Sequence, residues 1–352
     1  MSSCLIWLID NCLFQKHTIA LSCHAAFNMS RLNFTSSDST ALFGSICVLL
    51  SAVLFAIKAI LIKYTYQLSP DADAVTVLAL RMMSALPFFL AIALLSKAPI
   101  KSITWRDWSL LLFAGFIGYY LASILDFMGL MYVSASLERI ILFLYPTLTV
   151  LASAALYRQK ITGQTWLAIL LSYGGTLVVV FGEGWQALHA NNILLGSSLV
   201  FAGAIAYASY LVMTPTLIKR FGSWRFTGLA MSVACIAAIG HYLLVTPQPA
   251  QHLLQLPNGV IWYGMALGFF STVLPATLLM QGIARIGSAQ AALISAGGPI
   301  LTLLLAVAFL GEHLNLIQWI GCALNITGVL MITLMPKKPV PAPTAPSMEN
   351  LT

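Results

Sequence analysis

The sequence predicts an all-α integral membrane protein with ten transmembrane helices arranged as two inverted repeats of five helices. Three observations support this prediction. The chain of 352 residues is 60% hydrophobic and only 8% charged, whereas a soluble domain carries roughly a quarter charged residues. Its apolar residues fall into ten runs, each close to the ~20 residues that span a bilayer. The fourth and fifth runs recur, with many identical residues, as the ninth and tenth.

The recurrence aligns residues 129–177 with residues 282–330, 153 positions further along, without a gap. Many of the matches are apolar residues that any two membrane segments share, but others are harder to attribute to chance. These are the pairs Gly129/Gly282, Pro146/Pro299, Trp166/Trp319 and Gly175/Gly328. In the first span of each half, Gly44, Ser45 and Ala52 recur as Gly196, Ser197 and Ala204. We interpret the pattern as an internal duplication.

Residues 1–41 precede the first apolar run and are predicted to form a cytoplasmic N-terminal lead. They contain no positively charged start followed by an apolar run and a small-residue cleavage site, so we expect no signal peptide. Met29 is an alternative start, which leaves open whether residues 1–28 are translated.

Each apolar run predicts one helix, and most connections are short, so successive helices are antiparallel. The predicted spans are residues 42–64, 74–95, 108–131, 137–156, 165–181, 193–214, 226–245, 259–283, 289–310 and 316–334. The first repeat therefore covers residues 42–181 and the second covers residues 193–334. Residues 335–352 are Pro-rich and polar, which is typical of a disordered tail.

The Lys and Arg residues orient the predicted helices. With both termini in the cytoplasm, thirteen of the seventeen basic residues lie on the cytoplasmic side, as the positive-inside bias requires. Lys63 and Arg139 lie at the outer edge, and Lys58 and Arg81 lie within spans. Because each repeat has an odd number of spans, the second repeat enters the membrane from the opposite side and is inverted relative to the first.

Five ionisable residues within or bordering the spans are candidates for substrate binding or ion coupling: Lys58, Arg81, Asp126, Glu138 and Arg139. Each charge at membrane depth costs ~2.5–3.5 kcal/mol on insertion scales. All five fall in the outer half of the first repeat, so we expect them to share a water-filled cavity. Two other interpretations stay open. Glu138 and Arg139 suit an anchor at the membrane interface, and Arg81 and Asp126 suit a structural ion pair.

The second repeat is nearly uncharged at membrane depth and offers neutral polar groups instead. Tyr207, Tyr210 and Gln290 are its candidates for recognising substrate shape. Pro146 and Pro299 occupy equivalent positions, and each removes a backbone hydrogen bond. We expect this pair to act as hinges, with static kinks as the alternative.

Other classes of chemistry lack their sequence signals. The six cysteines are scattered without a CxxC pair, so neither a disulfide framework nor a zinc site is expected. We identify no catalytic residue, no metal ligands and no cofactor motif, and no P-loop for ATP. The net charge of +7 reflects the orientation bias rather than nucleic-acid binding. The expected partners are a small-molecule substrate and the lipid bilayer, in a monomer or a homodimer.

Two stretches carry a family resemblance: GLMYVSASLERIILFLYPTLTVLASAAL and GIARIGSAQAALISAGGPILTLLLAVAFLGEHL. With Arg81 in the second span, they resemble the EamA-type members of the drug/metabolite transporter superfamily over residues 42–334. The corner Leu310-Gly311-Glu312-His313-Leu314 matches the family's LGE-type ending. The first copy departs from it, because Arg158-Gln159-Lys160 stands at the positions equivalent to Gly311-Glu312-His313. Glu138-Arg139 also stands where the family usually has small residues.

The resemblance implies a secondary transporter of the cell (inner) membrane, in which the two repeats form gates around a central cavity. Family members usually export amino acids, metabolites or drugs. Proton coupling would use Asp126 or Glu138, since burial favours the neutral form of a carboxyl group; uniport and exchange stay open. The alternatives are an intramembrane enzyme, a receptor or a lipid scramblase. The dispersed histidines argue against an enzyme.

Overall fold

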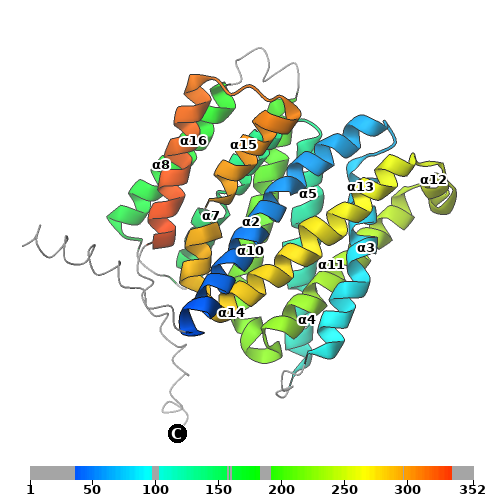
Figure 1. Cartoon of the computed structure of the whole chain (residues 1–352), viewed down its shortest axis with the longest axis horizontal. Helices are drawn as coiled ribbons and strands as arrows, with labels where there is room; N and C mark the ends of the chain where they lie inside the picture. The colour runs from blue at the N-terminus through cyan, green and yellow to red at the C-terminus, as the bar shows by residue number, and fades with distance from the viewer. Residues whose placement is uncertain are drawn as a thin grey trace, which may run out of the picture.

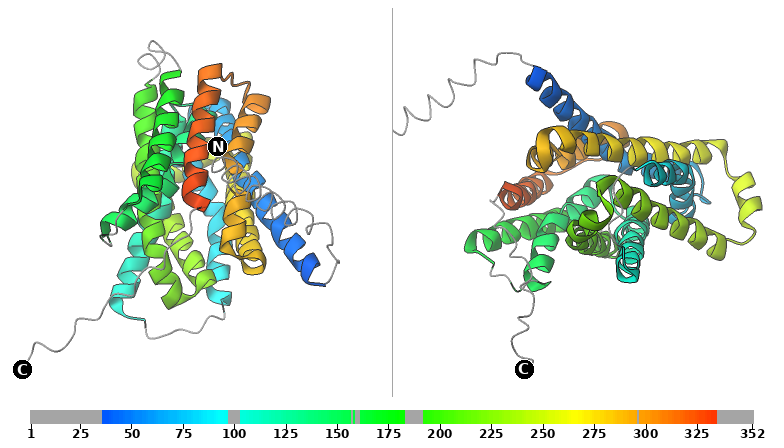
Figure 2. Two further views of the ribbon diagram at one scale, coloured as in Figure 1. Left: turned by 90° about the vertical axis from the view of Figure 1, so that its left-hand side faces the viewer. Right: turned by 90° about the horizontal axis from the view of Figure 1, so that it is seen from below.

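The structure is a computed structural model that describes residues 36–96, 103–156, 158, 161–182, 192–295 and 297–334. Within these residues every regular element is helical (Figure 1). Most of the predicted N-terminal lead and the whole tail beyond residue 334 lie outside the described residues. The helices of both halves run roughly along one axis, with α2 tilted across the others (Figure 2).

The first half contains five helical passes, two of which are interrupted. Its elements are α2 (Ser36–Leu68), α3 (Ala74–Leu95), α4 (Trp105–Gly115), the π-helical segment η2 (Phe116–Leu121), α5 (Ala122–Leu130), α6 (Ala135–Leu142), α7 (Tyr145–Leu156) and α8 (Gly163–Gly182). Helix starts follow the local sequence. Asp73 caps α3 by accepting from the Thr76 amide, and Thr104 and Asp107 form a reciprocal capping box at α4.

The second half follows the same order with two differences: it has one added short helix, and the single element α14 takes the place of α5 and α6. Its elements are α10 (Ile193–Phe221), α11 (Ser223–Val245), the added α12 (Pro249–Gln255), α13 (Asn258–Gly268), η3 (Phe269–Val273), α14 (Leu274–Ser295), α15 (Gly298–Leu310) and α16 (Leu316–Leu334). Within the described residues, nine helical stretches are long and apolar enough to cross a membrane, and α15 is apolar but shorter.

The fourth and ninth predicted spans are each broken in two, whereas their apolar sequences predicted continuous helices. The fourth span divides into α6 and α7. The ninth divides into residues 288–295 and α15, and Gly287, with φ of 80°, separates the first of these pieces from the rest of α14. Pro146 and Pro299 are each the second residue of the restarted helix. Proline disfavours helical geometry in the residue before it and lacks an amide donor, so it starts a helix more readily than it continues one.

The duplication extends to local irregularities and to packing. The π-helical segments η2 and η3 start 153 residues apart, the same spacing that relates the two sequence copies. Gly129 of α5 lies against Gly196 and Val200 of α10, where a Cβ would clash with the neighbouring helix. The equivalent Gly282 of α14 lies against Val48 of α2 in the same way. Small residues let helix backbones approach closely within a membrane.

The last helices of the two halves, α8 and α16, pack against each other with the same symmetry (Figure 1). Gly175 of α8 touches Gly321, and Gly328 of α16 touches Ala168. Adding 153 to 168 gives 321, so each contact is the image of the other. Two related halves packed through reciprocal contacts confirm the predicted repeat architecture.

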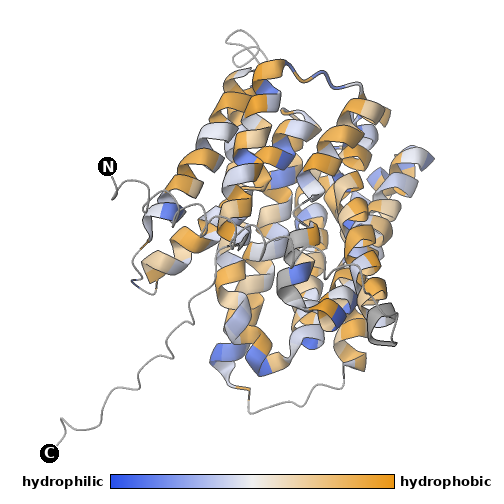
Figure 3. Cartoon of the chain, turned by 60° about the vertical axis from the view of Figure 1, so that its left-hand side comes forward, coloured by the Kyte–Doolittle hydropathy of each residue, from blue (hydrophilic) through white to orange (hydrophobic). Residues whose placement is uncertain are grey.

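Apolar residues make up most of each helix (Figure 3), and many large apolar side chains are exposed on the bundle. Leu94, Trp105 and Leu244 are 82%, 83% and 88% exposed. Such exposure would be unfavourable in water but suits contact with lipid. The fold is therefore that of a multi-pass membrane protein, and its ionisable interior residues need a separate explanation.

Candidate functional site

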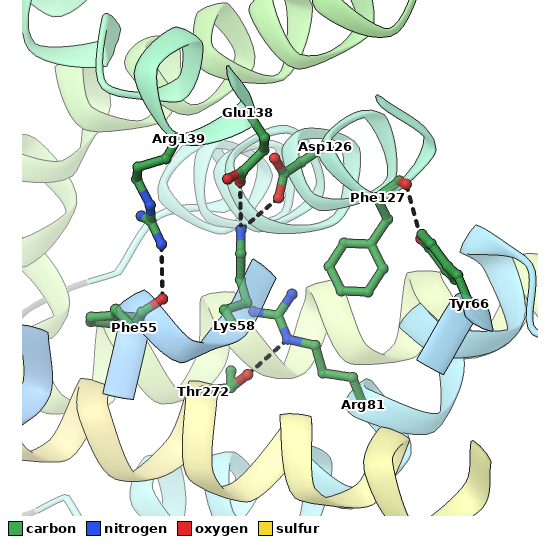
Figure 4. A network of polar contacts seen from close by, with 9 residues as sticks. All are labelled: Phe55, Lys58, Tyr66, Arg81, Asp126, Phe127, Glu138, Arg139 and Thr272. Carbon is green, nitrogen blue, oxygen red and sulfur yellow. Dashed lines mark hydrogen bonds and ion pairs between the residues drawn. The ribbon is translucent and has the colours of Figure 1, made fainter. Parts of the chain in front are cut away.

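Lys58 on α2 interacts with two carboxylates from neighbouring helices (Figure 4). Its Nζ lies 2.6 Å from Oδ2 of Asp126 on α5 and 3.3 Å from Oε1 of Glu138 on α6. The side chains of Lys58, Asp126 and Glu138 are 11%, 5% and 0% exposed. Three helices that are distant in sequence thus place one cation between two anions inside the bundle. We call these three residues the Lys58 cluster.

Both carboxyl groups of the Lys58 cluster keep one oxygen without a partner. Oδ1 of Asp126 and Oε2 of Glu138 are buried, and the described residues donate no hydrogen bond to either. The two carboxyl groups also lie within hydrogen-bonding reach of each other. One proton on either group would therefore supply the missing hydrogen bond between them.

Two arginines flank the Lys58 cluster (Figure 4). Arg81 on α3 is 8% exposed; its Nε donates to Oγ1 of Thr272 at 2.7 Å, and its Cζ lies 5.3 Å from the ring centre of Phe127. Arg139 on α6 donates from Nη2 to the carbonyl of Phe55 at 2.8 Å, and its Nε is buried without a partner. Within the described residues, neither guanidinium lies within 4.0 Å of a carboxylate.

These contacts contradict two of the interpretations that the sequence left open. Asp126 pairs with Lys58 and not with Arg81, so Arg81 and Asp126 do not form a direct ion pair. Glu138 is fully buried, so it is not a residue anchored at the membrane interface. The five ionisable candidates do lie near one another (Figure 4), whereas the water-filled cavity that they were expected to share stays a prediction.

Glu312, from the second half, holds the first turn of α6 in place. Its Oε1 accepts from the amide of Ala135 at 2.7 Å and its Oε2 from the amide of Ser136 at 3.1 Å. The first amides of a helix lack intrahelical partners and attract negative charge. The carboxylate therefore fixes the short helix that carries Glu138 and Arg139. The sequence marked Glu312 only as part of a family-like corner, and its contact with the other half was not predicted.

An aromatic cluster forms around Tyr207 and Tyr210 of α10, joined by Tyr119 of η2 and Tyr145 of α7. The hydroxyl groups of Tyr119 and Tyr210 are 3.1 Å apart. The Tyr207 ring lies edge-on to Tyr145 at 5.2 Å and stacks on Tyr210 at 5.8 Å. Tyr210 is buried, whereas Tyr145 and Tyr207 are half-buried. Tyr119 and Tyr145 were not among the sequence candidates, because span hydropathy alone does not single out aromatic residues.

The broken fourth span connects the Lys58 cluster and the aromatic cluster. Arg139 on α6 and Tyr145, the first residue of α7, lie on either side of this break. Pro146 is next to Tyr145, so a hinge at this break would move the two clusters relative to each other. Pro299 occupies the equivalent break. Gln290 is exposed, and the described contacts place it in neither cluster.

Two hollows open near the ends of the bundle, and none of the five ionisable candidates of the first half lines either of them. A groove of ≈ 730 Å³ lies between α3, α11 and α14. It is lined by Phe88, Ala91, Ile92, Leu95, Ser96, Ser223, Trp224, Val273 and Thr277. A smaller hollow of ≈ 410 Å³ at the opposite end includes Lys63, Tyr132 and Ser134. Phe88 is seven residues from Arg81, which is about 10 Å along a helix.

A helical bundle built from two related halves, with charged and aromatic residues gathered inside it, defines a multi-pass membrane protein of the inverted-repeat type. A model of the EamA-like transporter family matches residues 42–181 and residues 194–334. The chain belongs to this family and is a membrane transporter.

Known relatives agree with this assignment. The chain is 34% identical over 286 residues to the uncharacterized transporter YcbK of Bacillus subtilis, covering 79% of this chain and 89% of that protein. It is 28% identical over 207 residues to the uncharacterized inner membrane transporter YicL of Salmonella typhimurium, covering 57% and 65%. One solved crystal structure, 21% identical, matches with a TM-score of 0.54 over 84% of this chain and 97% of that one, which supports the fold.

Proposed function

We propose that the chain is a secondary active transporter that exports a small organic molecule across the cell (inner) membrane by alternating access, with both termini in the cytoplasm. The observation that carries the proposal is the Lys58 cluster, in which one largely buried lysine forms ion pairs with two buried carboxyl groups. Ionisable groups are retained at membrane depth chiefly where they serve transport or ion movement.

The Lys58 cluster is suited to proton coupling because its charge balance changes with a single proton. With both carboxylates ionised, Lys58 is shared between Asp126 and Glu138. A proton on Glu138 would leave Lys58 paired with Asp126 and would place the added O–H between the two carboxyl groups. The nearby charges that influence this step are those of Arg81 and Arg139. Proton entry and loss would therefore alter how firmly α2, α5 and α6 are held together.

Alternating access is supported by the unequal closure of the two ends. At the predicted outer end, Glu312 joins the second half to α6 of the first. At the predicted cytoplasmic end, the groove between α3, α11 and α14 is open. The position equivalent to Glu312 in the first half is Gln159, which lies outside the described residues. A contact between the halves at the outer end, beside a hollow of ≈ 410 Å³, and a groove of ≈ 730 Å³ on the cytoplasmic side suit a carrier that loads its substrate from the cytoplasm.

The first experiment identifies the substrate class. A host expressing the chain is grown against a panel of toxic amino acids, nucleosides and drugs. We expect resistance to one class and unchanged sensitivity to the others. Resistance to none would contradict export.

The second experiment tests Asp126, the carboxylate that stays paired with Lys58 when Glu138 carries the proton. Asp126→Asn removes one carboxylate but keeps its size, so we expect proton-linked transport of the panel substrate in proteoliposomes to be abolished while expression is normal. Asp71→Asn, an exposed carboxylate on a loop, is the matched control and should transport like the unmodified protein. Unchanged transport by Asp126→Asn would remove this residue from the mechanism.

A further inference from the structure

On the basis of the proposed transport function, we infer that the transported molecule carries an oxyanion group, a carboxylate or phosphate, attached to an aromatic ring. The oxyanion binds Arg139, and the ring lies against Tyr145 and Tyr207. The inference rests on a juxtaposition of a guanidinium without a carboxylate partner and half-buried aromatic rings at the break between α6 and α7.

The charge balance of the interior favours an anion. Among the five grouped ionisable residues of the first half, Lys58, Arg81 and Arg139 supply three positive charges, and Asp126 and Glu138 supply at most two negative charges. An uncompensated charge away from water is strongly unfavourable. A negatively charged ligand restores neutrality, and a cationic ligand would increase the imbalance.

Arg139 is the cation best placed to receive that anion. Both carboxylates nearby are engaged by Lys58, and the Arg139 side chain extends away from them toward the carbonyl of Phe55 (Figure 4). Its single hydrogen bond in the described structure uses Nη2, and its Nε is buried without a partner. A guanidinium presents five N–H donors in a planar fork that matches carboxylate and phosphate oxygens. Arg81, by contrast, bonds Thr272 and lies over Phe127.

The side chains near Arg139 indicate which chemical group of the ligand lies next to its oxyanion. Tyr145 is the first residue of α7, across the break from Arg139 on α6, and its ring meets Tyr207 edge-to-face at 5.2 Å. Both tyrosines remain half-buried deep within the bundle, so their rings have surface left for a ligand. A planar ring gains from stacked or edge-on contact with such side chains. The groove at the predicted cytoplasmic end is also mainly apolar and includes Phe88 and Trp224, which suits the passage of an aromatic compound.

Ligand binding to the full-length protein, purified in detergent, tests the inference without requiring transport. The probes are benzoate and phenyl phosphate as aromatic oxyanions, with benzamide, benzylammonium and acetate as comparisons. We expect saturable increases in unfolding temperature with one or both aromatic oxyanions, and much weaker effects of the neutral, cationic and non-aromatic probes. Equal effects of benzylammonium or acetate, or no saturable effect of either aromatic oxyanion, would overturn the inference.

Variants assign the binding to the residues named. Arg139→Gln should weaken binding of the aromatic oxyanion by at least about tenfold, because a charge-assisted contact is lost. Arg139→Lys should weaken it less, because the charge remains without the planar fork. Tyr207→Ala should weaken it about three- to tenfold. The exposed Arg285→Gln is the matched control and should bind like the unmodified protein.

The Arg139 variants also separate binding from structural support. If Arg139 only fastens α6 to the Phe55 carbonyl, Arg139→Gln will lower the unfolding temperature of the free protein, and the residual folded protein will bind with unchanged affinity. That result would overturn the inference. Oxyanion binding without transport in liposomes would refute the transport proposal and leave this site standing. Export of a cationic compound, with no oxyanion binding, would refute this site and leave the transport proposal standing.

Discussion

The two halves of the molecule share their packing but differ in the chemistry of their interiors. The glycine contacts between α5 and α10 reappear between α14 and α2. In these contacts the residues of α2 and their counterparts in α10 are 152 positions apart in the sequence. At that spacing Lys58 corresponds to Tyr210. At the spacing of 153 that relates the later helices, the counterparts of Asp126, Glu138 and Arg139 are Leu279, Ala291 and Ala292.

This difference separates what the fold requires from what the site requires. Small residues recur where helix backbones approach closely, so both halves pack their helices through equivalent glycines. The charges do not recur, so the fold does not depend on them. The first half therefore supplies ionisable groups and the second supplies mainly aromatic surface, which together suit recognition of a charged, ring-containing molecule.

The largest expected effect on stability follows from removing Lys58, the cation that two carboxyl groups of the first half share. Lys58→Met leaves Asp126 and Glu138 buried without their partner, which should destabilise the protein by about 3–5 kcal/mol. Thermal unfolding in detergent measures the loss. The triple variant Lys58→Met, Asp126→Asn, Glu138→Gln is the control: it should recover most of the stability but no proton-linked transport. An unfolding temperature of Lys58→Met equal to that of the unmodified protein would refute the role of the cluster.

A smaller effect is expected at the contact that joins the halves. Glu312→Ala removes the acceptor of two amides at the start of α6, and hydrogen bonds to charged groups contribute about 1.5–3 kcal/mol. A cysteine at Ser136, which is fully buried, should then react faster with a membrane-impermeant maleimide from outside. Glu312→Gln keeps an acceptor and should lie between. The contact is unimportant for closure if all three proteins react at one rate.

The shared packing predicts paired effects. Gly129→Ala and Gly282→Ala each force a Cβ into the facing helix and should destabilise by about 1–3 kcal/mol, in similar amounts. Gly174→Ala is the control, because a Cβ there meets open space and alanine favours the helix by about 0.5–1 kcal/mol. Strongly unequal effects of the first two substitutions, measured by unfolding temperature, would contradict equivalent packing.

The smallest effect is expected at the counterpart of Lys58. Tyr210→Phe removes the hydrogen bond to Tyr119 but keeps the stacking on Phe226, so the cost should be about 0.5–1.5 kcal/mol. The comparison with Lys58→Met is made in the same unfolding assay. A larger loss at Tyr210 than at Lys58 would reverse the assignment of the critical polar contact to the first half.

The sequence predicted the features that depend on periodicity and composition. The spans, the repeat and the grouping of ionisable residues follow from hydropathy and from equal spacing. Features that depend on tertiary contacts were not predictable in the same way. Hydropathy is continuous across the α6–α7 break, so only Pro146 hinted at it. Asp126 had two cationic candidates, Lys58 and Arg81, and helix depth alone does not decide between them.

Alternating access requires two halves that are inverted relative to each other in the membrane, and one labelling experiment tests this arrangement directly. In a cysteine-free background, Glu312→Cys and Arg158→Cys place single thiols at adjacent columns of the repeated corner. Intact cells are treated with a membrane-impermeant maleimide before and after permeabilisation. We predict that residue 312 is labelled in intact cells and residue 158 only after permeabilisation. Labelling of both residues from the same side would contradict the inverted arrangement, and with it the proposed alternating access.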